Sequence, residues 1–170
     1  MKTKQLAMDA MLSAMCAVLG YLSLDMGSMK LSFESFPILL GAAMFGPVDG
    51  MLIGGIGTLI YQLLRYGVTV TTPLWILPYV VFGLVVGLYA KKWDYSPTPR
   101  QTLALVVLAQ LLITVLNTGV LCVDGLIFGY FTPVFIYGAL GLRLLVCLAK
   151  SLVFALILPK ISSALRPMVK

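Results

Sequence analysis

The stretch TLALVVLAQLLITVLNTGVLCV, which occupies residues 102–123, carries no charged side chain. An α-helix of this length rises about 33 Å, which is enough to cross the roughly 30 Å hydrocarbon core of a bilayer. A helix with so many apolar residues is stable only where lipid or other protein surrounds it. This stretch therefore predicts a transmembrane helix.

Five further apolar runs accompany this one, and charge, Pro or Gly bounds each of them. They occupy residues 5–24, 33–45, 50–64, 74–90 and 134–158. The runs at 33–45 and 50–64 are short for a bilayer, and only residues 46–49 separate them. We therefore expect these two spans to form a tight hairpin that leans on its neighbours.

The composition agrees with a membrane protein. Hydrophobic residues make up 61% of the chain, charged residues 11%, and the mean hydropathy is +1.04. A soluble domain is only about half apolar. Six helices of about 20 residues would use nearly all of the chain. The sequence thus predicts an all-α membrane protein with six transmembrane helices, packed as one compact domain over residues 1–170.

The basic residues predict the orientation, because Lys and Arg collect on the cytoplasmic side of membrane proteins. With six spans, one side receives eight basic residues: Lys2, Lys4, Lys91, Lys92, Arg100, Lys160, Arg166 and Lys170. The other side receives only Lys30 and Arg65. We therefore expect a multi-pass protein of the bacterial plasma membrane with both termini in the cytoplasm. The loops at 25–32, 65–73 and 124–133 would then be external.

Several function classes have no support in the sequence. The chain contains no His, no phosphate-binding Gly-rich loop and no helix with paired carboxylates three or four residues apart. The twelve Lys and Arg residues are scattered and form no stripe that would suit nucleic acid. The sequence therefore predicts a protein that is not an enzyme, with no metal, no cofactor and no nucleic-acid partner.

Small residues recur at four-residue spacing, which lets helix backbones approach closely. Gly46, Gly50 and Gly54 follow this spacing, and so do Gly83 and Gly87 in the next span. For the glycines we favour packing within the bundle. Ala10 and Ala14 form a similar face on the first span. This face suits either internal packing or an interface with a separate membrane subunit.

Two cations lie inside the last predicted span. Arg143 and Lys150 are seven residues apart, which places them on one helical face about two turns apart. Charges within a membrane usually face the bundle interior or water. These two could receive an anionic ligand, or they could pair with Asp9, Asp49 or backbone carbonyls. Lys150 could also extend toward the cytoplasm.

Polar and aromatic residues gather near the predicted external ends of the spans. Aromatic residues at this depth also form the interfacial belt, and buried amides also bond between helices. A polar ligand is the alternative partner, because a buried amide needs hydrogen bonds. The candidate binding residues are Phe33, Glu34, Gln62, Arg65, Tyr66, Trp75, Tyr79, Asn117, Tyr137, Arg143 and Lys150.

Residues 30–54, KLSFESFPILLGAAMFGPVDGMLIG, resemble the second and third spans of the substrate-binding S components of energy-coupling factor (ECF) transporters. The pair Ala10 and Ala14 is similar to the Ala-x-x-x-Ala face that this family presents to its membrane scaffold subunit. The resemblance implies a six-helix subunit that captures a vitamin at the external face. A scaffold subunit and two cytoplasmic ATPases would be its partners.

Within this family the chain looks most like the folate-type branch. The residues that carry this likeness are Leu116-Asn117-Thr118, Tyr137-Gly138, Arg143 and Lys150. Thr58 stands where folate-type members often have an acid. The alternatives are an S component for pantothenate, cobalamin or a deazapurine, or a membrane scaffold protein without a transport role.

Overall fold

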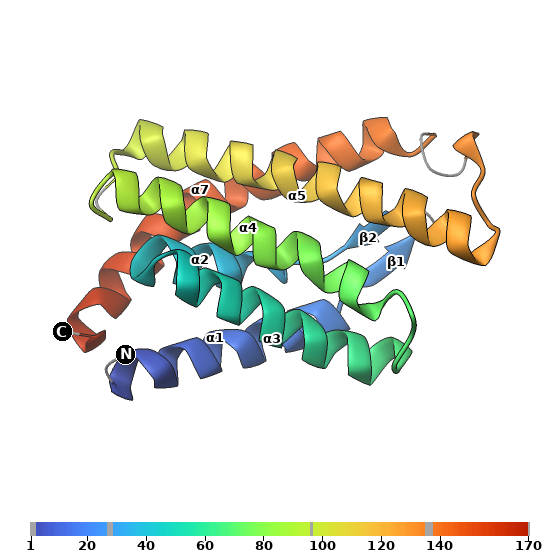
Figure 1. Cartoon of the computed structure of the whole chain (residues 1–170). Helices are drawn as coiled ribbons and strands as arrows, with labels where there is room; N and C mark the ends of the chain where they lie inside the picture. Colours follow the sequence, from blue (N-terminus) through green and yellow to red (C-terminus); the bar gives the residue numbers. More distant parts are fainter. Residues whose placement is uncertain (1–2, 27–28, 96, 135–137, 170) are drawn as a thin grey trace.

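The computed structural model describes residues 3–26, 29–95, 97–134 and 138–169, and within them helices dominate. The helices are α1 (Thr3–Tyr21), α2 (Ser35–Phe45), α3 (Pro47–Tyr66), α4 (Thr72–Lys92), α5 (Pro99–Phe128) and α7 (Leu140–Val169). Two short strands, β1 (Leu24–Met26) and β2 (Met29–Leu31), follow α1. The helices lie side by side as a bundle, with the strands near one end (Figure 1).

Four of the described helices are long and apolar enough to cross a membrane: α3, α4, α5 and the segment Leu140–Leu165 of α7. α1 is not among these four helices, because its mean hydropathy is lower. Two charged residues, Lys4 and Asp9, lie within α1. α2 has 11 residues, which rise only about 16 Å. The chain is an all-α membrane protein in which α2 is buried among the longer helices rather than spanning by itself.

Three predicted boundaries were wrong. The fifth helix, α5, continues to Phe128 through part of the loop predicted at 124–133. The third span is not short, because α3 begins at Pro47 and runs for 20 residues. Pro is well suited to the first turn of a helix, and an acid such as Asp49 is favourable there. Gly46 alone connects α2 to α3, at a positive φ of 113°. The last helix runs over Leu140–Val169 instead of 134–158, since a helix can continue beyond the end of its apolar run.

The predicted loop at 25–32 instead contains an antiparallel hairpin. β1 pairs with β2 in the register Leu24 with Leu31, Asp25 with Lys30 and Met26 with Met29. Each strand has three residues, too few to give a recognisable alternating pattern. The hairpin lies away from the end of the bundle where α1 begins and α7 ends (Figure 1).

Glycines bring α3 and α4 into backbone contact, which confirms the prediction that they pack within the bundle. A Cβ atom on Gly50 would lie 2.7 Å from the carbonyl oxygen of Gly83, and one on Gly83 would overlap Gly50. A Cβ on Gly54 would lie 2.5 Å from the carbonyl oxygen of Tyr79. Such contacts leave no room for a side chain. This close approach fixes α4 against α3 and positions Tyr79 for the site described below.

α1 packs on α3 by one face only. Leu12 and Cys16 are buried there, and Gly57 of α3 meets Cys16 so closely that a Cβ would lie 2.6 Å from that of Cys16. Ala10 and Ala14 are exposed on another face of α1. The described part of the chain therefore does not bury these two alanines.

Candidate functional site

A cavity of about 500 Å³ opens among the hairpin, the start of α2, and helices α3, α4, α5 and α7. The cavity is lined by residues of the predicted third, fourth, fifth and sixth spans. The volume lies within the range of small-molecule sites. Its lining includes the polar residues Lys30, Ser32, Glu34, Ser35, Gln62, Thr69, Thr71, Gln110, Thr114, Asn117, Thr118, Asp124, Arg143 and Lys150, and the aromatic residues Tyr61, Tyr66, Trp75, Tyr79 and Phe128.

One face of α5 supplies a polar wall along the cavity. Gln110, Thr114, Asn117, Thr118 and Asp124 all line it, and the spacing between the first four follows the helical repeat. From Gln110 to Asp124 the helix rises about 21 Å. The cavity is therefore elongated along α5, and the residues of this face can contact different parts of one ligand.

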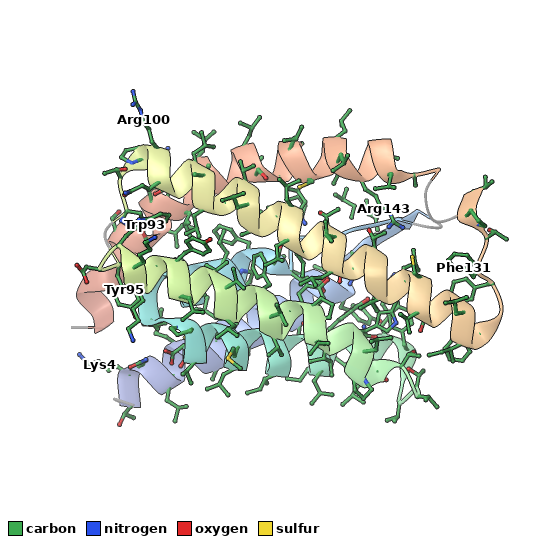
Figure 2. All side chains as sticks on the ribbon, turned by 45° about the horizontal axis from the view of Figure 1, so that its top comes forward. Lys4, Trp93, Tyr95, Arg100, Phe131 and Arg143 are labelled. Atoms are coloured by element: carbon green, nitrogen blue, oxygen red, sulfur yellow. The ribbon has the colours of Figure 1, made fainter. Side chains whose placement is uncertain are left out.

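α7 supplies two cations to the cavity lining. Arg143 lies between α7 and α5 (Figure 2), and its Nη1 donates to Thr118 Oγ1 over 3.0 Å. Lys150 also lines the cavity, and its Nζ lies 5.8 Å from the centroid of the Phe154 ring. Seven residues of helix separate the two cations by about 10 Å along the axis. Lys150 thus faces the cavity rather than the cytoplasm.

Glu34 lies at the inner side of the cavity and is almost fully buried, with 1% of its surface exposed. Lys30 Nζ of the hairpin lies 3.1 Å from both of its carboxylate oxygens, and Ser32 Oγ donates to Oε1 over 3.0 Å. Tyr79 OH also donates to Oε1. Lys30 Nζ lies 3.7 Å from the centroid of the Tyr61 ring. The carboxylate is thus satisfied by donors from three segments of the chain.

Asp124 lines the cavity near the C-terminal end of α5. Trp75 Nε1 donates to its Oδ1 over 3.2 Å, and Tyr130 OH donates to its Oδ2. Burial and this hydrogen bond raise the pKa of Tyr130 above its usual range, so its hydroxyl remains a donor at neutral pH. Trp75 is consequently held with its indole ring at the cavity wall.

The charges that line the cavity favour an anion. Three cations, Lys30, Arg143 and Lys150, face two carboxylates, Glu34 and Asp124, so three minus two gives a formal charge of +1. Glu34 is paired with Lys30, and Asp124 accepts from Trp75 and Tyr130. The lining therefore keeps one net positive charge, which an anionic ligand group can balance.

The structure brings together eight of the eleven predicted site residues. Those that line the cavity are Glu34, Gln62, Tyr66, Trp75, Tyr79, Asn117, Arg143 and Lys150. Phe33 is 43% exposed and outside the lining. Arg65 also lies outside it, because its Nη1 donates to the carbonyl oxygens of Tyr21 and Ser23. Tyr137 lies outside the described residues.

Other lining residues were missed from the sequence. Gln110, Thr114 and Thr118 are polar residues within the apolar run at 102–123, on the same helical face as Asn117. That shared periodicity was a usable signal. Lys30 was counted only as a topology signal, and no local pattern indicates that it would fold over Tyr61 and pair with Glu34.

Two comparisons with known proteins bear on identity. The family model of the ECF transporter substrate-specific component matches residues 4–165. A protein named UPF0397 protein from Lactobacillus johnsonii is 40% identical over 60 residues, which are 35% of this chain and 31% of that protein. The match thus spans only about a third of that curated relative. Because the family model covers nearly the whole chain, this protein belongs to the family of ECF transporter substrate-specific components.

Proposed function

We propose that the cavity binds a vitamin-like ligand with an anionic group, and that a folate-like vitamin fits it best. The observation that carries this proposal is the pair of cations, Arg143 and Lys150, on one wall of an elongated 500 Å³ cavity. Trp75 and Tyr79 offer aromatic surface for a flat ring. The amides of Gln62, Gln110 and Asn117 offer both donors and acceptors.

The protein works as a single binding domain and performs no catalysis itself. As a substrate-specific component it delivers its ligand to a membrane scaffold subunit, and two cytoplasmic ATPases supply the energy. The ligand enters from the external face of the bacterial plasma membrane, where the hairpin and the ends of α3, α4 and α5 surround the cavity. The exposed face of α1 with Ala10 and Ala14 contacts the scaffold.

Mass spectrometry of ligand extracted from purified protein tests the proposed substrate. We expect a flat compound with at least one carboxylate or other anion, and we expect folate to compete for the site. Pantothenate, cobalamin and a deazapurine are the matched competitors. Extraction of a neutral deazapurine, or competition by that compound alone, would contradict the anionic ligand.

Both termini should lie in the cytoplasm. The expectation rests on eight basic residues against two across six spans, and it is supported by the position of the start of α1 and the end of α7 at the same end of the bundle (Figure 1). Cysteine labelling from outside intact cells should leave cysteines placed near residues 3 and 165 unmodified. Labelling of either one would refute this orientation.

Replacement of Ala14 by leucine should reduce transport while ligand binding by the isolated subunit survives. Ala14 is exposed, so a larger side chain there obstructs an approaching helix. Transport assays with the complete transporter and binding assays with the isolated subunit separate the two effects. Ala104→Leu, at an exposed alanine of α5, is the control. If Ala14→Leu reduces ligand binding as much as transport, the alanine face serves packing within this chain and not contact with the scaffold.

A further inference from the structure

Gln62 of α3 carries a buried amide that the fold leaves without a hydrogen-bond partner. Only 6% of the surface of Gln62 is exposed, and the residue lines the cavity. Neither Oε1 nor Nε2 makes a hydrogen bond within the described part of the chain, and both atoms keep surface that solvent reaches. Since Gln62 is a lining residue, that surface opens on the cavity. A molecule in the cavity can therefore meet the amide directly.

The other two amides of the cavity lining are bonded to neighbouring side chains. Gln110 Nε2 donates to Ser35 Oγ over 3.3 Å, and Asn117 Nδ2 donates to Tyr79 OH over 3.4 Å. Buried polar groups in folded proteins almost always have partners, so a buried amide with both ends open requires an explanation. The described part of the fold does not use the Gln62 amide, which leaves a ligand as its partner.

The packing of α3 against α4 places Gln62 beside an aromatic part of the cavity. The two helices are antiparallel, and Gly54 of α3 meets the backbone of Tyr79 of α4. Gln62 lies eight residues after Gly54, and Thr71 lies eight residues before Tyr79, so Gln62 is level with Thr71. Trp75 follows about one turn further along α4. The α3–α4 pair thus offers an amide next to aromatic surface, whereas the two cations come from α7, which packs mainly on α5.

We infer that Gln62 binds the polar edge of the ligand's flat ring and is a specificity-determining residue. The inference rests on the proposed function and adds a requirement to it. A glutamine amide presents a donor and an acceptor side by side, so the ring carries an acceptor next to a donor, as in a lactam or an aminopyrimidine. No bond within the described chain holds the amide, so it can turn to match either order of the two groups. A ring with an apolar edge there is rejected, because it displaces water from the amide without replacing the hydrogen bonds.

Calorimetry on monodisperse protein tests this assignment with three probes. They are folate, its 4-amino analogue, and p-aminobenzoylglutamate, which keeps the anionic arm of folate but lacks the flat ring. Gln62→Leu should weaken folate binding about 10- to 100-fold, the size expected for loss of two buried hydrogen bonds. The 4-amino analogue should lose affinity by a similar factor, because the wild-type amide turns to match it. p-Aminobenzoylglutamate should bind Gln62→Leu and the wild type alike.

Ligand-free protein gives an independent test. Because the Gln62 amide has no partner in the described fold, Gln62→Leu should unfold at the same temperature as the wild type or at a higher one. Gln110→Leu is the matched control, since it removes an amide that donates to Ser35, and it should lower the unfolding temperature. A Gln62→Leu variant that loses as much stability as Gln110→Leu would show that the fold uses the amide, and would overturn the inference.

The binding results separate this inference from the proposed function. Unchanged folate affinity in folded Gln62→Leu protein would overturn the role of Gln62 and leave the proposed ligand in place. An equal loss for p-aminobenzoylglutamate would show that Gln62 does not act on the ring. A loss confined to folate, or to its 4-amino analogue, would overturn the free turning of the amide. If the wild type does not bind folate, the proposed ligand is wrong and the ring-edge assignment falls with it.

Discussion

A Gly83→Leu variant should yield no folded protein. Gly83 of α4 faces Gly50 of α3 so closely that even a Cβ atom would overlap the Gly50 backbone. The same two helices also approach closely at Gly54, where a Cβ would lie 2.5 Å from the carbonyl oxygen of Tyr79, so separating them at Gly83 would disturb a second contact. The milder Gly83→Ala change should cost about 1–3 kcal/mol or more, the usual range for overpacking a core. Thermal unfolding in detergent, followed by size-exclusion chromatography, measures both.

Gly119 provides the matched control for this prediction. It lies within α5, and a Cβ there would meet nothing within 4 Å. Gly119→Ala should therefore leave stability unchanged or raise it by up to about 1 kcal/mol, because alanine favours the helix. A Gly83→Ala variant that unfolds at the same temperature as Gly119→Ala would show that α3 and α4 do not pack at this distance.

An Arg143→Ala variant should bind the anionic ligand about one to two powers of ten more weakly. The substitution removes a charge-assisted contact worth about 1.5–3 kcal/mol. Arg143→Lys should also weaken binding if the contact is bidentate, because an ammonium lacks the planar guanidinium fork. Calorimetric titration of monodisperse protein with folate measures both variants.

Arg100→Ala is the control for the loss of a positive charge. Arg100 is exposed at the start of α5, far along the bundle from Arg143 (Figure 2), so its removal should leave affinity unchanged. If Arg143 has only a structural role, Arg143→Ala should lose folded protein together with binding. Folded Arg143→Ala protein with the affinity of the wild type would exclude Arg143 from the site.

Features that depend on local sequence were predicted well. Charge and amide groups inside apolar runs are costly, and this identified Arg143, Lys150 and Asn117, all of which line the cavity. Four-residue glycine spacing indicated close helix packing, and the contacts of these glycines with the facing backbone between α3 and α4 confirm it. In both cases a single physical constraint acts on one helix and is visible in its own residues.

Features that depend on distant partners were not predicted. The pairing of Lys30 with Glu34 requires the hairpin to fold over Tyr61, and three-residue strands leave no periodic signal. Arg65 looked like a site residue, but it donates to backbone oxygens at the end of α1. Hydropathy also underestimated the length of α3. Pro47 and Asp49 resemble loop residues in the sequence, although both suit the first turn of a helix.

The most direct test of the central claim is a structure of the purified protein with its co-purified ligand bound. The ligand should occupy the cavity between α5 and α7, with an anionic group about 3 Å from the guanidinium of Arg143 or the ammonium of Lys150. A ligand seated outside this cavity, or one that turns a neutral apolar group toward both cations, would contradict the account.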